Sequence, residues 1–128
     1  MNTNDRKAAL NNEELDAFEK IQQEAADTPV SSYTHVFSNP FTYEGRTFER
    51  LTFDFSKLSG NDDLAIENEL QALGKPVIVA EMSGDYQIRL AARACTEKLG
   101  VDVFMSMPLR DFHRIRNRAR SFLLSAGI

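Results

Sequence analysis

The sequence predicts an α+β fold: a β-hairpin or small antiparallel sheet packed against about three helices, plus a loosely attached N-terminal helix. Apolar side chains alternate for most of the stretch from Phe41 to Phe55, which is the period of a half-buried strand. In three later segments apolar residues recur every three or four positions, as in amphipathic helices. Glycine, proline and capping residues separate these segments.

Composition limits the class of protein. The chain has 128 residues, of which 42% are hydrophobic, so it is long enough for one domain with a modest core. Its single cysteine cannot form an intramolecular disulfide, which favours a reducing compartment, and we expect the cytoplasm. No apolar run approaches the roughly 20 residues that span a bilayer, and the first residues do not resemble a signal peptide. We therefore expect a soluble protein without a membrane partner.

Charge is distributed unevenly along the chain. The net charge is −4, and the first 28 residues are rich in acids. Near the C-terminus five arginines lie close together: Arg110, Arg114, Arg116, Arg118 and Arg120. The overall acidity argues against general duplex binding, which requires a basic face that neutralises many phosphates. A local basic strip is still compatible with the sequence.

We divide the chain into residues 1–32, a polar acidic N-terminal segment, and residues 33–128, the α+β domain. Within the first part, Glu13 to about Ala26 is expected to form a helix that ends at Thr28-Pro29. Its narrow apolar side contains Leu15, Phe18, Gln22 and Ala25, with Ile21 beside them. Such a helix either docks weakly on the domain or becomes ordered only when a partner covers it.

The expected hairpin turns at Glu44-Gly45. A two-residue loop there pairs Phe41 with Phe48 on one face, whereas the other face of the second arm contains Leu51, Phe53 and Phe55. The second arm must therefore bury both faces or contain a β-bulge, and we favour a bulge near Glu49-Arg50. Before the hairpin we expect only a short extended piece around Tyr33 to Phe37.

The first helix of the domain is expected from Asn61 to Leu73. Capping side chains precede it, two carboxylates (Asp62 and Asp63) fall in its first turn, and Gly74-Lys75-Pro76 ends it. We expect one face to pack against the hairpin, while Leu64 points elsewhere. That face contains Ile66, Leu70 and Leu73. The following Val77–Ala80 is either an added strand or buried extended chain.

A second helix is expected from about Asp85 to Leu99, before Gly100. Its apolar stripe consists of Ile88, Ala91, Ala92, Cys95 and Leu99. Tyr86 and Leu90 lie on the opposite side. This helix is therefore either covered on both sides or offers a second surface to a partner.

The last helix is expected to start at Ser106-Met107-Pro108, with Ser106 as its cap. Its buried face should contain Phe112, Ile115, Ala119, Phe122, Leu123 and Ala126. At about 100° per residue, Arg110 and Arg114 lie in the centre of the opposite face. Arg116, Arg118 and Arg120 flank the apolar stripe.

No catalytic, metal or cofactor motif is visible. His35 and His113 belong to no spacing such as H-E-x-x-H, so we expect both at the surface or its boundary. Cys95 lies on an apolar stripe and should act as a small hydrophobe. Asp62 and Asp63 are explained as charges in the first turn of a helix, and no phosphate-binding glycine loop is present. We expect neither an enzyme nor a cofactor.

Four blocks of the sequence, taken in order and spacing, resemble a known family. They are Phe41–Arg46 and Leu51–Phe55 in the hairpin, Leu58–Glu67 at the first helix, and Met107–Ile115 followed by Phe122–Leu124. Together with Ala91–Ala94 between them, they make roughly residues 41–125 similar to the tail assembly chaperones of long-tailed bacteriophages and prophages.

The resemblance implies a non-catalytic protein of virion morphogenesis. Such a chaperone is made in the cytoplasm of the bacterial host, binds the tape measure protein and keeps it soluble. It is displaced when tail tube protein polymerises, and it is absent from the finished tail. Contact with tail tube protein and self-association stay open.

A tape measure protein in solution exposes long apolar helical faces, so its chaperone needs many modest contacts. We expect apolar contacts from Tyr86, Leu90 and Leu124, and contacts with acidic rims from Arg110, Arg114 and Arg118. The alternative for Tyr86 and Leu90 is a place in the core. A second hypothesis is a small nucleic-acid-binding phage regulatory protein that uses the C-terminal arginine face.

Overall fold

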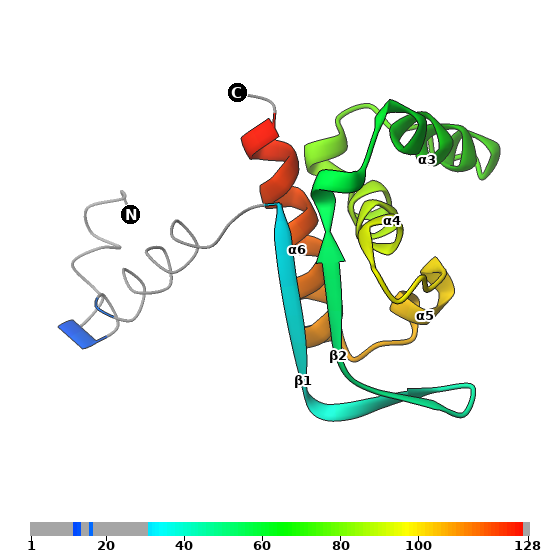
Figure 1. Ribbon diagram of the computed structural model, residues 1–128. Coiled ribbons are helices and arrows are strands. Elements are labelled where there is room, and N and C mark those ends of the chain that lie inside the picture. The colour runs from blue at the N-terminus through cyan, green and yellow to red at the C-terminus, as the bar shows by residue number, and fades with distance from the viewer. Residues whose placement is uncertain (1–11, 14–15, 17–30, 127–128) are drawn as a thin grey trace.

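The computed structural model describes residues 12–13, 16 and 31–126 of the chain (Figure 1). Asn12, Glu13 and Asp16 are helical, and the rest of the predicted N-terminal helix lies outside the described residues. The predicted α+β class is confirmed. In order, the elements of residues 31–126 are β1 (Ser32–Tyr43), β2 (Arg46–Asp54), the 3-10 helix η1 (Phe55–Lys57), α3 (Gly60–Ala72), the 3-10 helix η2 (Ala80–Met82), α4 (Gly84–Ala94), α5 (Val101–Met105) and α6 (Leu109–Ala126).

Strands β1 and β2 form the predicted antiparallel hairpin. Its two-residue turn consists of Glu44 and Gly45, with φ of 47° and 81°. Positive φ at both positions is the geometry whose twist matches paired strands. The turn pairs Phe41 with Phe48, as predicted, and β1 also includes the piece that was expected only to be extended.

The hairpin contains the expected irregularity, but on the other strand. The register shifts between the pairs Val36–Arg50 and Phe41–Phe48, so residues 37–40 of β1 lie opposite Glu49 alone. The bulge was predicted near Glu49-Arg50 of β2, and its assignment to that strand was wrong. Pro40 explains the choice of strand, because proline has no N–H to donate to a ladder. Beyond the shift the tip of the hairpin bends toward α5 (Figure 1).

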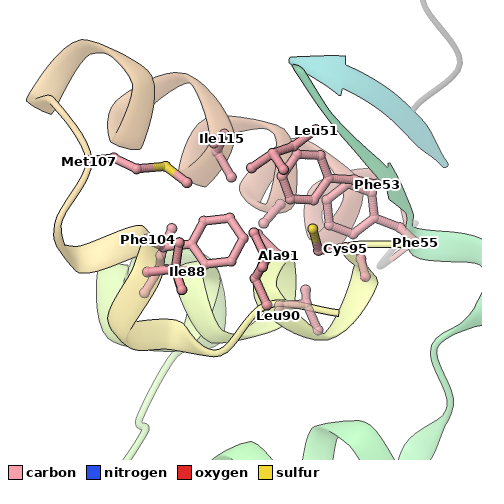
Figure 2. Packing of buried hydrophobic residues seen from close by; sticks show 14 of the residues in the cluster. Leu51, Phe53, Phe55, Ile88, Leu90, Ala91, Cys95, Phe104, Met107 and Ile115 are labelled. Atoms are coloured by element: carbon pink, nitrogen blue, oxygen red, sulfur yellow. The ribbon is translucent and has the colours of Figure 1, made fainter. Parts of the chain in front are cut away.

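The core lies where the hairpin meets α4, α5 and α6 (Figure 2). Helix α6 packs against α4 and β1, and β2 contacts α4. Burying one such aromatic or aliphatic side chain stabilises the fold by about 1.5–3 kcal/mol. Side chains that meet there include Leu51, Phe53, Phe55, Ile88, Leu90, Ala91, Cys95, Phe104, Met107 and Ile115.

The predicted face of α6 is largely confirmed. Ile115 and Ala119 are fully buried, and Phe112, Phe122 and Leu123 pack partly buried against the core. Helix α6 begins after Pro108, and Ser106 does not cap it. The Ser106 hydroxyl instead donates a hydrogen bond to the Asp102 carbonyl at 3.1 Å and closes α5.

Helix α3 begins with a capping box, in which the Ser59 N–H donates to the Asp62 carboxylate at 2.8 Å. It ends before Gly74, whose φ of 76° favours glycine. Contrary to prediction, α3 packs chiefly on α4 and not on the hairpin. Only Ile66 and Leu70 are buried, and Leu73 is exposed because it follows the last helical residue.

Helix α4 is shorter than predicted because the chain that follows it pairs with β2. Cys95 forms a β-bridge with Phe53, and the Thr96 N–H donates to the Thr52 carbonyl at 2.9 Å. These hydrogen bonds replace those of a continued helix to Leu99. The short helix α5, which was not predicted, follows Gly100. Of Val77–Ala80, no residue forms a strand, and Ala80 begins η2.

Candidate functional site

The link between α3 and α4 exposes an unusual amount of apolar surface. Leu73 is 57% exposed, Ile78 92%, Val79 45% and Met82 83%. We call these four side chains the apolar connection. Single exposed apolar residues are common, but several within ten residues mark a candidate contact surface.

The apolar connection adjoins the C-terminal half of α6. Helix η2 packs against α6, and the Arg120 Nε donates a hydrogen bond to the Glu81 carbonyl at 3.1 Å. One turn after Arg120 along α6 lies Leu124, which is exposed. Figure 1 shows η2 beside this part of α6. Leu124 therefore extends the apolar surface onto the last helix.

Five arginines lie along α6. None of them forms an ion pair with a carboxylate within residues 31–126. Arg110 and Arg114 are exposed, as expected for the centre of the outer face. Arg118 lies over the Tyr33 ring, with its guanidinium carbon 4.7 Å from the ring centroid. The Arg116 Nε is buried and lacks a hydrogen-bond partner among the described residues. Among the described residues, the charges of these arginines are therefore not neutralised by an ion pair.

The residues predicted to bind a partner differ in their exposure. Tyr86 and Leu90 are only 2% and 4% exposed, so the core alternative is the correct one for both. The Tyr86 hydroxyl donates to the Asp63 carboxylate, which joins α4 to α3. Burial, followed by this carboxylate, raises the Tyr86 pKa. Leu124 and Arg110 are accessible on α6 together with Arg114, and Arg118 is half-buried.

His35 is buried, so its expected place at the surface or boundary was wrong. Its Nδ1 lies 2.8 Å from the Tyr33 hydroxyl, and its Nε2 lies 2.7 Å from the Asp111 carboxylate. With both ring nitrogens engaged, His35 ties β1 to α6. Tyr33, His35 and Phe37 alternate along β1, so their side chains lie on the same face of the hairpin. This alternation could have predicted that His35 faces the core. His113 is exposed, as predicted.

A cleft lies between α3, α4 and the chain from Cys95 to Val101. This cleft of about 670 Å³ is lined by four basic side chains, Lys57, Arg89, Arg93 and Lys98, and we call it the basic cleft. Its apolar lining includes Ile66, Ala92, Leu99 and Val101. The sequence alone did not indicate it, because the basic residues come from separate segments.

Three carboxylates neutralise part of the basic cleft, and one of them is that of Asp85, whose Oδ1 lies 3.4 Å from the Arg89 Nη1. Glu69 accepts from the Arg89 Nε at 2.8 Å, and Asp62 accepts from the Arg93 Nε at 2.7 Å. Lys57 and Lys98 have no ion-pair partner among residues 31–126. Lys98 has φ of 57°, a costly conformation for a residue with a side chain.

Cys95 also lines the basic cleft, but its chemistry is that of a buried thiol. Burial raises the pKa of Cys95 to about 11. The thiolate is therefore scarce at neutral pH, and the thiolate is the nucleophilic form. This agrees with the expected behaviour of a small hydrophobe.

Comparison with known proteins adds no relative. No family model matches the chain, and no curated protein or solved structure matches it either. Within the part of the chain that the structure describes, no group of three or more His, Cys, Asp or Glu residues is arranged to hold a metal. In the same residues, no helix is both long and apolar enough to cross a membrane.

Proposed function

We propose that this protein is a non-catalytic tail assembly chaperone of a long-tailed bacteriophage or prophage, which holds the tape measure protein in solution. The observation that carries the proposal is the apolar connection, in which Ile78 is 92% and Met82 83% exposed, next to a helix whose arginines have no carboxylate partner among residues 31–126. A helical client with an apolar stripe and acidic margins complements such a surface.

Binding of this kind is reversible. Each Ile, Leu or Met side chain that the client covers contributes about 1.5–3 kcal/mol at most, before the cost of ordering both partners. A few such contacts hold the client in solution, and tail tube protein can displace them as it polymerises. The chaperone then acts in the host cytoplasm and is left out of the finished tail.

The test is co-expression with the tape measure protein from the same phage or prophage. We expect a soluble complex that co-purifies with this chain. The double variant Ile78→Asp, Met82→Asp should lose the complex, because a charge on each side chain opposes transfer into an apolar contact. Its matched control is Leu64→Asp, at an exposed apolar position of α3 outside the apolar connection.

Two results would contradict the proposal. One is a tape measure protein whose solubility does not change when this chain is present, with nothing co-purifying. The other is equal loss of the complex in the double variant and in Leu64→Asp, because that would mean a general effect of added charge. Circular dichroism of each variant must match the unaltered chain.

The five arginines of α6, which form no ion pair within residues 31–126, favour a second candidate function, that of a nucleic-acid-binding phage regulatory protein. DNA and RNA titrations at low and moderate salt distinguish it from the chaperone. A binder shows affinity that falls steeply with salt and weakens in Arg110→Ala, Arg114→Ala. Flat titrations together with a tape measure complex would remove this candidate.

A further inference from the structure

The two long edges of the hairpin differ in what pairs with them. On the β2 edge, the Thr52 N–H donates to the Glu97 carboxylate at 2.9 Å, and the Thr52 carbonyl accepts from the Thr96 N–H at 2.9 Å. Strand β1 pairs with β2 alone in the sheet of the described residues. Figure 1 shows β1 on the side of the hairpin away from α4 and α5.

Pairing with β2 determines which backbone groups of β1 point outward. Opposite residues of an antiparallel pair either exchange both hydrogen bonds or exchange none. Thr34 lies opposite Thr52, whose N–H and carbonyl are both engaged by the chain after α4. Thr34 therefore directs its own N–H and carbonyl away from β2, and so do Ser32 and Val36, two positions to either side. These groups have no hydrogen-bond partner among residues 31–126.

This part of β1 lacks the features that usually prevent an edge strand from pairing with another chain, which are charges, prolines and bulges. The segment Ser32–Phe37 contains no Lys, Arg, Asp or Glu, and the register shift and Pro40 come after it. The side chains of Thr34 and Val36 are exposed, and both are β-branched, which favours strand pairing. The outer edge of residues 32–36 is therefore suited to a further strand.

Arg118 of α6 lies beside this edge. Phe53, opposite Tyr33 on β2, stacks on the Tyr33 ring with centroids 5.9 Å apart. The Arg118 guanidinium carbon is 4.7 Å from the same ring centroid. Since Phe53 covers the ring from the β2 side, Arg118 covers it from the side of the outer edge of β1.

The row of arginines continues from Arg118 along β1. Helix α6 runs opposite to β1, because Asp111 contacts His35 and Arg118 contacts Tyr33. Arg114 is exposed and lies one turn before Arg118, about 6 Å away along the helix axis. Alternate residues of a strand are about 7 Å apart. The spacing of these arginines thus matches that of side chains on one face of a strand.

We propose that the β1 edge binds an extended acidic segment of another protein, which adds a third, antiparallel strand to the hairpin. Its backbone pairs with Thr34 and Val36, and its carboxylates at alternate positions reach Arg114 and Arg118, which have no ion pair within residues 31–126. Backbone hydrogen bonds give such a complex its affinity, and the alternate side chains give it specificity. The inference does not rest on the proposed function, because this edge is separate from the apolar connection.

A second copy of β1 is the competing occupant. Antiparallel pairing about Thr34 would set two hairpins edge to edge and bring the arginine rows of the two α6 helices toward each other. Like charges repel, whereas the carboxylates of an acidic strand attract the same arginines. Charge therefore favours the acidic segment over a second copy.

The experiment titrates the isotope-labelled full chain with a synthetic peptide in which glutamate alternates with threonine. We expect the Thr34 and Val36 amide signals to shift and their exchange with solvent to slow. The same peptide with glutamine for glutamate should bind weakly. Arg114→Gln, Arg118→Gln should weaken binding of the acidic peptide by about tenfold or more. The matched pair Arg46→Gln, Arg50→Gln, at exposed arginines of β2, should leave binding unchanged.

Two methylated peptides test the strand pairing without altering the protein. In an antiparallel third strand, residues whose side chains face α6 direct their N–H groups away from β1, and the residues between them direct theirs toward it. Methylation of the threonine amide nitrogens should therefore abolish binding, whereas methylation of the glutamate amide nitrogens should not.

Four results would overturn the inference. They are no change at Thr34 or Val36, binding that survives methylation of the threonines, equal weakening in the two arginine pairs, and protection of both amides without peptide that is lost on dilution. The last result would assign the edge to a second copy. None of these results depends on the tape measure protein, so failure of the proposed function and failure of this inference are distinguishable.

Discussion

Helix α3 with its connection to α4 differs in construction from the rest of the described domain. The hairpin, α4, α5 and α6 share a continuous apolar core, whereas α3 buries only Ile66 and Leu70. Polar contacts supplement its attachment to α4: the ion pairs of Arg89 and Arg93, and the hydrogen bond from the Tyr86 hydroxyl. The Arg93–Asp62 pair is partly exposed and is worth about 0–1 kcal/mol, whereas Arg89 is buried.

Under the proposed function, stability and adhesion belong to separate parts of the molecule. The core half, meaning the hairpin, α4, α5 and α6, buries most of its large apolar side chains and pairs the buried His35 with Asp111. Its exceptions are the exposed side chains of Val36, Met105, Leu109 and Leu124, and the buried Arg116 Nε, which has no hydrogen-bond partner among the described residues. The α3 half, meaning α3 and its connection to α4, instead leaves Leu73, Ile78 and Met82 in solvent, where they do not stabilise this chain. Under the proposed function, the client covers these side chains. Four substitutions test this division, in order of decreasing effect on stability.

The largest loss is expected from Phe104→Ala in α5. Phe104 is fully buried and packs against Phe53, with ring centroids 6.0 Å apart. Removing the ring deletes its burial and leaves a cavity, so the free energy of unfolding should fall by about 3–5 kcal/mol. Urea denaturation followed by circular dichroism measures this. A loss as small as that of Leu64→Ala on α3 would end the assignment of stability to the core half.

The next largest loss is expected from Asp111→Ala. This change leaves the buried imidazole of His35 without its carboxylate partner, and the unfolding free energy should fall by about 2–3 kcal/mol. The double variant with His35→Ala should lose less than the sum of the two single losses. Additive losses in this cycle would show that the two side chains do not interact.

A smaller and local loss is expected from Asp62→Ala in the first turn of α3. The Asp62 carboxylate accepts from the Ser59 N–H and from Arg93, so its removal should cost about 1 kcal/mol. Hydrogen exchange should show faster opening of α3 while the amides of β2 stay protected. Equal acceleration in both would mean that α3 does not open separately.

The same side chain predicts a dependence on pH. The Ser59 N–H first, and then Arg93, hold the pKa of Asp62 below its ordinary value of 3.8. The stabilisation is therefore fully present above that value and is lost as the pH falls through the lowered pKa of the folded state. Exchange of α3 amides should accelerate in that acid range, and Asp62→Ala should remove this contribution.

Local sequence signals were sufficient for most elements of the fold. The Glu44-Gly45 turn, the start of α3 after capping side chains and the apolar face of α6 each depend on neighbouring residues, and each was predicted. The failures involve contacts between distant segments. Helical periodicity continues past Cys95, but hydrogen bonds to Thr52, 44 residues away from Thr96, end the helix.

The candidate surfaces were harder to predict for the same reason. Leu124 and Arg110 are accessible where helical geometry placed them, because their exposure depends on one helix. Tyr86 became buried because α3 covers the second face of α4, which periodicity in α4 cannot reveal. The apolar connection was not predicted to be exposed, because Ile78 and Val79 occur in an apolar run that is typical of buried chain.

The smallest effect on stability is expected from Ile78→Ser. The side chain is 92% exposed, so the folded state gains almost nothing from it, and the free energy of unfolding should change by less than about 0.5 kcal/mol. Thermal and urea denaturation should therefore match those of the unaltered chain, while binding of a helical client weakens. A clear loss of stability would show that Ile78 packs within this molecule in solution. It would then belong to the core half, and the division between the two parts would fail at the residue that defines it best.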